Sequence, residues 1–125
     1  KSDLIDILLA SCEGRLNELN VKWDERACVC VVMASGGYPG TYSQGYPIHG
    51  LDKVTEDDAL VFHAGTKNDG GNIVTHGGRV LGVTSVGANL EKARARAYEA
   101  VEKIDFEHMF FRRDIGLKTL KVVKV

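Results

Sequence analysis

The spacing of apolar positions predicts a helix at the start of the chain. Six apolar residues recur there with helical periodicity: Leu4, Ile5, Leu8, Leu9, Cys12 and Leu16. Ser2 precedes them as an N-cap, and Asp3 lies in the first turn, where the helix dipole favours a negative charge. We expect the apolar stripe of this helix to be buried.

Residues 27–34 predict a central strand. Their sequence, Ala-Cys-Val-Cys-Val-Val-Met-Ala, is apolar at both alternating sets of positions and rich in β-branched side chains. This pattern is typical of a strand that is covered on both faces. Cys28 and Cys30 share one face but are ill suited to bridging each other, so we expect them, like Cys12, to be buried reduced thiols.

Residues 59–87 predict an antiparallel meander. Three stretches have the composition of strands: residues 61–64, 72–76 and 79–86. Residues 67–71, Lys-Asn-Asp-Gly-Gly, supply the positive φ angles that the first reversal needs, and Gly77-Gly78 is a two-residue loop suited to a primed hairpin turn. We therefore expect each strand to pair with the next.

The clearest helix follows the meander. Its apolar positions are Leu90, Ala93, Ala97, Val101 and Ile104. They lie three or four residues apart, Asn89 is suited to cap the helix, and the opposite face is charged and expected to be solvated. Together these patterns predict an α+β fold. A curled, mostly antiparallel sheet, made of the meander and the central strand, is covered by this amphipathic helix and flanked by the N-terminal helix.

The other segments have weaker patterns. Residues 36–51 are rich in Gly, Pro and Tyr and predict a long irregular loop. The lysine-bearing residues 117–125 are compatible with either an edge strand or a frayed terminus. The length of 125 residues, without an evident linker, predicts a single domain over residues 1–125. Because the chain begins with Lys rather than Met, we expect it to be a piece of a longer protein.

Composition narrows the classes of function. The 16 basic and 17 acidic residues give a formal net charge of -1, so no overall field attracts nucleic acid or an anionic membrane. The apolar runs are far shorter than the roughly 20 residues that span a bilayer, and no signal segment opens the chain. We expect a cytoplasmic protein with no nucleic-acid and no membrane partner.

The Gly-rich loop at residues 36–40 is the first candidate for ligand contact. It follows a predicted strand and could bring backbone N–H groups close to an anion, but it lacks the Lys-Ser/Thr pair and the following helix of a phosphate-binding loop. We interpret it mainly as a shaped turn, with a substrate contact as the alternative. The four histidines lack the spacing of metal ligands, so no metal site is expected.

Arginines provide the other candidates. Arg79 follows the predicted glycine turn, where its guanidinium could reach a carboxylate or a phosphate. Arg112, Arg113 and Asp114 form a second charged cluster. For both we favour the simpler interpretation, an ion pair that holds the domain to itself or to a larger protein. No side chain has the setting of an activated nucleophile, so no catalytic residue is assigned.

Several segments, taken in order, resemble the C-terminal domain of the glycinamide ribonucleotide synthetases (phosphoribosylamine–glycine ligases), which are ATP-grasp enzymes of purine biosynthesis. They are KSDL at residues 1–4, VVMASGGYPG at 31–40, YPI at 46–48, GL at 50–51, VFHAGT at 61–66, THGGRVLGVT at 75–84 and FRRDIG at 111–116. Several such strings in register are far more specific than any one alone.

The resemblance implies a ligase that joins glycine to phosphoribosylamine with ATP and magnesium. The ATP-grasp elements and the acidic metal-binding motif of that family lie upstream of Lys1, so this fragment is expected to bind neither cofactor and to be inactive alone. Its partners are then the N-terminal and ATP-grasp domains of the same chain. Residues 1–20 form a helix at the junction with the ATP-grasp part, and residues 27–116 form the C-terminal domain proper.

The resemblance also directs attention to particular residues. The expected substrate contacts are Gly36, Gly37, Tyr38, Pro39 and Arg79. The expected structural or interdomain residues are Arg112, Arg113 and Asp114. Two alternatives stay open: a scaffold module in which no residue reaches substrate, and the equivalent domain of another ATP-grasp ligase, such as a carboxylase subunit.

Overall fold

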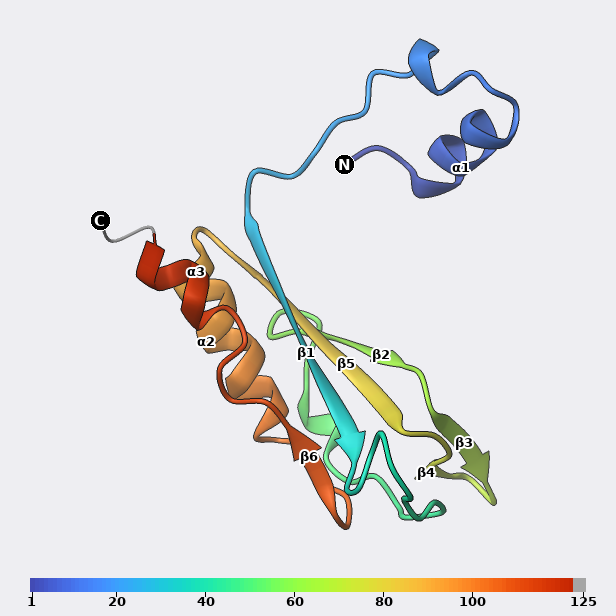
Figure 1. Ribbon diagram of the computed structural model, residues 1–125, viewed down its shortest axis with the longest axis vertical. Coiled ribbons are helices and arrows are strands. Elements are labelled where there is room, and N and C mark those ends of the chain that lie inside the picture. The colour runs from blue at the N-terminus through green and yellow to red at the C-terminus, as the bar shows by residue number, and fades with distance from the viewer. Residues whose placement is uncertain (123–125) are drawn as a thin grey trace.

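The computed structural model describes residues 1–122 as a mixed α+β domain with an N-terminal extension (Figure 1). The strands are β1 (Ala27–Ser35), β2 (Leu60–His63), β3 (Thr66–Asp69), β4 (Asn72–Thr75), β5 (Arg79–Gly87) and β6 (Met109–Phe111). The helices are α1 (Leu4–Cys12), α2 (Leu90–Val101) and α3 (Leu117–Val122), with short 3-10 turns at Leu16–Glu18 and Leu51–Lys53. The predicted fold class is confirmed.

The main sheet has the strand order β2-β5-β1-β6, and all of its neighbours are antiparallel. Its centre is the long pairing of β1 with β5, in which Val31 lies opposite Val83 and Met33 opposite Leu81. A bulge follows Met33, so that Ala34 lies opposite Arg79. This bulge sets the position of Arg79 at the end of the sheet.

The meander prediction is wrong in its pairing. β2 pairs with β5, while β3 and β4 form a separate two-stranded hairpin. Of the reversal predicted at residues 67–71, only Gly70 and Gly71 make the hairpin turn, with positive φ angles of 59° and 92°, because residues 67–69 belong to β3. Gly77-Gly78 is not a hairpin loop, however, because the chain leaves the main sheet at Gly65 and returns to it at Gly77.

Helix α2 covers one face of the sheet. Asn89 caps it as predicted, since its side-chain oxygen accepts a hydrogen bond of 2.9 Å from the Lys92 N–H. The buried residues of the helix are Ala93, Ala97, Ala100 and Val101. They pack with Val31, Met33 and Val83 in the main core. Ile104 follows the helix end rather than lying within it, but it is also buried.

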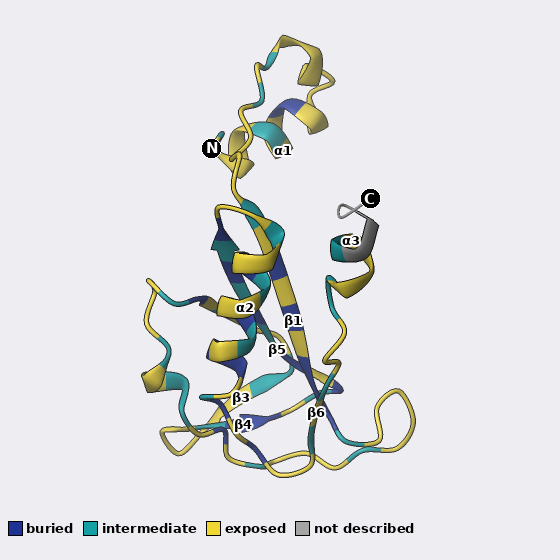
Figure 2. Ribbon diagram, turned by 90° about the vertical axis from the view of Figure 1, so that its left-hand side faces the viewer, coloured by how far each residue is buried: buried dark blue, intermediate teal, exposed yellow. Residues whose placement is uncertain are grey.

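The other face of the sheet is open, which corrects the prediction that β1 is covered on both sides. Figure 2 shows β1 alternating between buried and exposed residues. We call this surface the open face; its exposed apolar residues are Cys28, Cys30, Val32, Leu60, Phe62 and Phe110. All three cysteines are free and exposed, because two lie on the open face and Cys12 lies on α1. The expectation of buried thiols is therefore wrong.

Helix α1 lies beyond the N-terminal end of β1, away from the sheet (Figure 1). Asp3 rather than Ser2 caps it, accepting a 2.7 Å hydrogen bond from the Ile5 N–H. The predicted stripe is exposed in this chain, with Leu4 and Ile5 each 65% accessible, because only Ala10 of the helix is buried. Burial of this stripe was a wrong expectation for the 125-residue chain.

The remaining segments connect these elements. Residues 36–51 form the predicted irregular loop, tied to the rest by isolated bridges that join Pro47 to Val74 and His49 to Asp105. Residues 117–122 form α3 rather than the predicted edge strand or frayed terminus, and residues 123–125 lie outside the described residues. Within the described chain, no helix is both long enough and apolar enough to cross a membrane.

Candidate functional site

Two hollows flank the loop that follows β1. The first, the open-face groove, has a volume of about 240 Å³ and continues the open face at the end of the sheet. Its lining residues are Cys30, Val32, Ala34, Tyr38, Arg79, Phe110, Arg112 and Ile115. The groove therefore joins an apolar wall to two guanidinium groups and one phenol ring.

Arg79 is the distinctive charge of this groove. It is exposed at the first position of β5, and it makes no ion pair with any residue among 1–122. An unpaired guanidinium beside an apolar wall has its five donors available to an anionic ligand. The described residues therefore hold no ion pair by which Arg79 binds the domain to itself, and the other half of the simpler interpretation, an ion pair to a larger protein, stays a prediction.

Arg112 is in a different electrostatic state. Its Nε and Nη2 donate to the two carboxylate oxygens of Asp114 at 2.9 and 2.6 Å. This bidentate pairing raises the pKa of Arg112 and lowers that of Asp114. Because Asp114 neutralises Arg112, the net positive charge of the groove comes from Arg79.

Helix α2 holds the segment that carries Arg112. The Tyr98 hydroxyl donates to the Arg112 carbonyl at 2.6 Å and accepts from the Ile115 N–H at 3.2 Å. One turn away, Arg94 donates to the carbonyls of Arg113 and Ile115 at 2.6 and 2.8 Å. These four bonds satisfy backbone groups of a segment without regular structure. They fix this side of the groove to the covered side of the domain.

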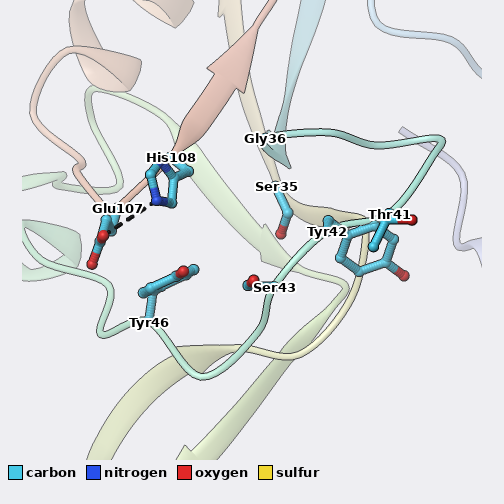
Figure 3. Close-up of a pocket in the computed structure, with 8 residues that line it drawn as sticks. All are labelled: Ser35, Gly36, Thr41, Tyr42, Ser43, Tyr46, Glu107 and His108. Carbon is cyan, nitrogen blue, oxygen red and sulfur yellow. Dashed lines mark ion pairs between the residues drawn. The ribbon is translucent and has the colours of Figure 1, made fainter.

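The second hollow, the polar cleft, has a volume of about 160 Å³ (Figure 3). It is lined by Ser35, Gly36, Thr41, Tyr42, Ser43, Tyr46, Glu107 and His108. In Figure 3, His108 and Glu107 lie on one side of the cleft, with His108 Nε2 3.2 Å from Glu107 Oε1, and Ser35 and the 41–43 segment lie on the other. His108 has a φ of 58°, and a Cβ on Gly36 would lie 2.6 Å from its carbonyl oxygen, so the loop and the start of β6 meet without side chains between them.

The structure separates the predicted site residues. Tyr38 and Arg79 line the groove together, while Gly36 lines the polar cleft. Gly37 and Pro39 line neither hollow; Gly37 has a φ of 96°, and the Tyr38–Pro39 peptide is cis. These two residues shape the loop rather than face either hollow.

The charged cluster at residues 112–114 is divided as well. Arg112 lines the groove, Asp114 pairs with it, and Arg113 turns toward α2, where it donates to Glu102 at 2.8 Å. All three side chains thus make ion pairs within the domain.

Sequence reasoning missed the apolar half of the groove. Val32, Phe110 and Ile115 come from three separate segments, and only the sheet order brings them to Arg79. The sequence also did not predict the four hydrogen bonds between the side chains of Arg94 and Tyr98 and the backbone of residues 112–115, which we call the clasp. The charged face of α2 was expected to be solvated. Across residues 1–122, no three His, Cys, Asp or Glu side chains gather in a way that could hold a metal ion.

Comparison with known proteins identifies what this domain resembles. The family model described as "Phosphoribosylglycinamide synthetase, C domain" matches residues 28–118. A phosphoribosylamine–glycine ligase of Allochromatium vinosum is 48% identical over 120 residues, and one of Escherichia coli O157:H7 is 49% identical over 122 residues. These alignments cover 96% and 97% of this chain but 28% of each relative.

A solved structure shows the same fold. The phosphoribosylamine–glycine ligase of Thermotoga maritima matches with a TM-score of 0.71 at 33% sequence identity. The match covers 87% of this chain and 27% of that chain. The chain thus spans little more than a quarter of the length of the proteins that it matches.

Proposed function

Because the chain belongs to the family described as phosphoribosylglycinamide synthetase, C domain, we propose that it is the C-terminal domain of a ligase that joins glycine to phosphoribosylamine with ATP in purine biosynthesis. The family match over residues 28–118 is the observation that carries this proposal. The activity belongs to the whole protein, since this chain corresponds to about 28% of the curated relatives.

ATP and magnesium then bind outside this chain, in the ATP-grasp part of a cytoplasmic enzyme. The chain contributes no phosphate-binding loop of the Walker type and no assigned magnesium ligand. A calorimetric titration of the 125-residue chain with Mg-ATP is expected to give no binding heat. Clear heat with one-to-one stoichiometry would contradict this division of labour.

The open face and α1 are the surfaces through which this domain joins the rest of the protein. Leu60, Phe62 and Phe110 are 51%, 56% and 56% accessible on the same face of one sheet. Apolar side chains gathered in this way mark an interaction surface, whereas single exposed ones do not. We assign the upstream domains of the same chain as the occupant, because most of the relatives' length lies outside this domain.

Arg79 and the 36–39 loop are the elements that we assign to substrate contact. Both substrates carry groups that a guanidinium recognises: glycine a carboxylate and phosphoribosylamine a phosphate. Arg79 is unpaired among the described residues and lies in a groove beside Tyr38, whereas Arg112 in the same groove is neutralised by Asp114.

The test is Arg79→Ala in the full-length protein. Loss of a hydrogen-bonded charge contact costs about 1.5–3 kcal/mol, so the KM of one substrate should rise roughly tenfold to a hundredfold. Arg79→Lys should recover part of this loss, since the charge returns without the planar fork. Arg96→Ala, which removes an exposed arginine of α2, is the matched control and should leave both KM values unchanged.

A scaffold role is the second candidate, and one observation favours it. Arg112, Arg113 and Asp114 all make ion pairs within the domain, as expected of side chains that hold it together. If Arg79→Ala lowers thermal stability while both KM values and kcat stay at wild-type levels, the scaffold role is correct and substrate contact is not.

A further inference from the structure

Gly78 occupies a position where a side chain would collide with Tyr38. A Cβ built on Gly78 overlaps Cδ2 of the Tyr38 ring and lies 2.9 Å from its Cγ. Gly78 is absent from the residues with positive φ, so its backbone conformation would accept an ordinary L-residue. Glycine is therefore required here by the neighbouring ring rather than by the turn.

The backbone around Gly78 has no freedom to move away. The Ser35 N–H donates to the Gly78 carbonyl at 2.8 Å, and the Ser35 hydroxyl donates to the Gly77 carbonyl at 2.9 Å. On the other side, a Cβ on Gly77 would lie 2.9 Å from the Cα of Gly65, so two backbones are already in contact there. An added methyl group at position 78 must instead displace the Tyr38 ring.

Tyr38 is able to move in response. The residue is 39% accessible, and its ring packs edge-on against the Tyr42 ring, with the two ring centroids 6.0 Å apart. Its backbone is held by a hydrogen bond of 3.1 Å from its N–H to the Ser35 carbonyl. Ser35 thus holds the backbones of both Gly78 and Tyr38, so we expect the ring rather than the backbone to move.

We propose that Gly78 is a positioning residue, which seats the Tyr38 ring beside Arg79 and so sets the shape of the open-face groove. The inference rests on the proposed substrate contact of this groove. Tyr38 and Arg79 both line the groove, and Gly78 directly precedes Arg79 in the chain. Because the ring and the guanidinium line the same groove, the position of the ring limits the poses that an anionic substrate can adopt there.

The test is a double-mutant cycle in the full-length protein with Gly78→Ala, Tyr38→Ala and the double variant. Gly78→Ala should raise the KM of the substrate that Arg79→Ala affects by about tenfold, with a smaller change in kcat. Because Gly78 acts through Tyr38, the double variant should have the KM of Tyr38→Ala alone. Wild-type kinetics for Gly78→Ala where Arg79→Ala does raise the KM, or two effects that multiply, would overturn the inference.

Thermal unfolding distinguishes a clash between the added methyl group and the Tyr38 ring from strain in the backbone at position 78. If Gly78→Ala lowers Tm, removing the ring in the double variant should restore it to the value of Tyr38→Ala. A double variant that is still destabilised relative to Tyr38→Ala would place the strain in the backbone and overturn the inference.

The failure of the proposed function would give a different result. If Arg79→Ala leaves the kinetics unchanged, the proposed substrate contact is wrong. The effect of Gly78 on the position of the Tyr38 ring can still be measured with 3-fluorotyrosine incorporated in the full-length protein. The ¹⁹F resonance of position 38, assigned by its loss in Tyr38→Phe, should shift in Gly78→Ala. An unshifted resonance would show that Gly78 does not position the ring.

Discussion

The two faces of the main sheet differ in what their side chains do. On the face under α2, Val31 and Val83 are fully buried against Ala97 and other residues of the helix, and these residues form one core cluster. On the open face, Val32 is 45% and Phe62 56% accessible, although they belong to the same strand pairs. The adjacent residues Val31 and Val32 of β1 thus differ in role: Val31 stabilises the core of the domain, whereas Val32 is available for contact with another surface.

This difference shows that an apolar pattern does not say which surface covers a strand. A core residue of this domain and an interface residue of a larger protein have the same composition, because both lose contact with water. The open-face groove joins the exposed apolar residues of the open face to the unpaired guanidinium of Arg79.

The largest expected effect compares Leu81, 1% accessible under α2, with Leu60, 51% accessible on the open face. Leu81→Ala should lower the free energy of unfolding of the 125-residue chain by about 3 kcal/mol, because it leaves a cavity in the core. Leu60→Ala should cost less than about 1 kcal/mol in the same urea titration. Equal losses would abolish the distinction between the faces.

A smaller effect is expected at the clasp that links the covered side to the groove. Tyr98→Phe keeps the ring under Arg94 but removes the hydroxyl that bonds Arg112 and Ile115, at an expected cost of about 1.5 kcal/mol. Tyr42→Phe is the control, since the Tyr42 hydroxyl makes no hydrogen bond with any described residue. Similar unfolding curves for the two variants would mean that the clasp contributes nothing.

The two helix caps extend the comparison to packed and unpacked helices. Asn89→Ala should lower global stability by about 1 kcal/mol, because α2 unfolds with the core. Asp3→Ala removes an equivalent bond from α1, which lies away from the sheet, so it should reduce helical circular dichroism without moving the main transition. A shift of that transition by Asp3→Ala would show that α1 belongs to the cooperative unit.

The smallest expected effect is a pH dependence at the edge of the covered face. Hydrogen bonds from Lys103, then from Thr55, lower the pKa of Asp58 from its ordinary value of 3.8. A carboxyl group with a lowered pKa stabilises the fold above its unfolded pKa and loses that contribution as the pH falls through the folded value. Asp58→Asn should therefore flatten the loss of stability below about pH 4.

The control for this prediction is Asp57→Asn. Asp57 is adjacent and exposed, and it makes no ion pair with the side chains described over residues 1–120. Its replacement should leave the acid limb of the stability profile as in the wild type. If both variants flatten the profile equally, the Asp58–Lys103 pair is not the cause.

Local signals predicted the elements that depend on local physics. The period of Ala93, Ala97 and Val101 and the cap at Asn89 identified α2, and the glycines at 70 and 71 identified a turn. These features are set by residues within one or two turns of the chain.

Features that depend on distant contacts could not be predicted in the same way. β2 pairs with β5 although β3 and β4 lie between them in the chain and form a separate hairpin. The spacing of apolar and glycine residues over 60–87 does not indicate this pairing. The conflict between Gly78 and the Tyr38 ring arises across 40 positions of sequence. The sequence shows that position 78 is glycine, but it does not show that the Tyr38 ring leaves no room there for a side chain.

The most direct test of the account is the accessibility of the open face in the full-length protein. Cys28 and Cys30 are exposed on that face in this domain, so alkylation of each can be followed by mass spectrometry under native conditions and in urea. If the upstream domains cover the open face, both thiols should react far more slowly in the native protein than in the unfolded one. Equal native and unfolded rates would contradict the assignment of the open face as an interdomain surface.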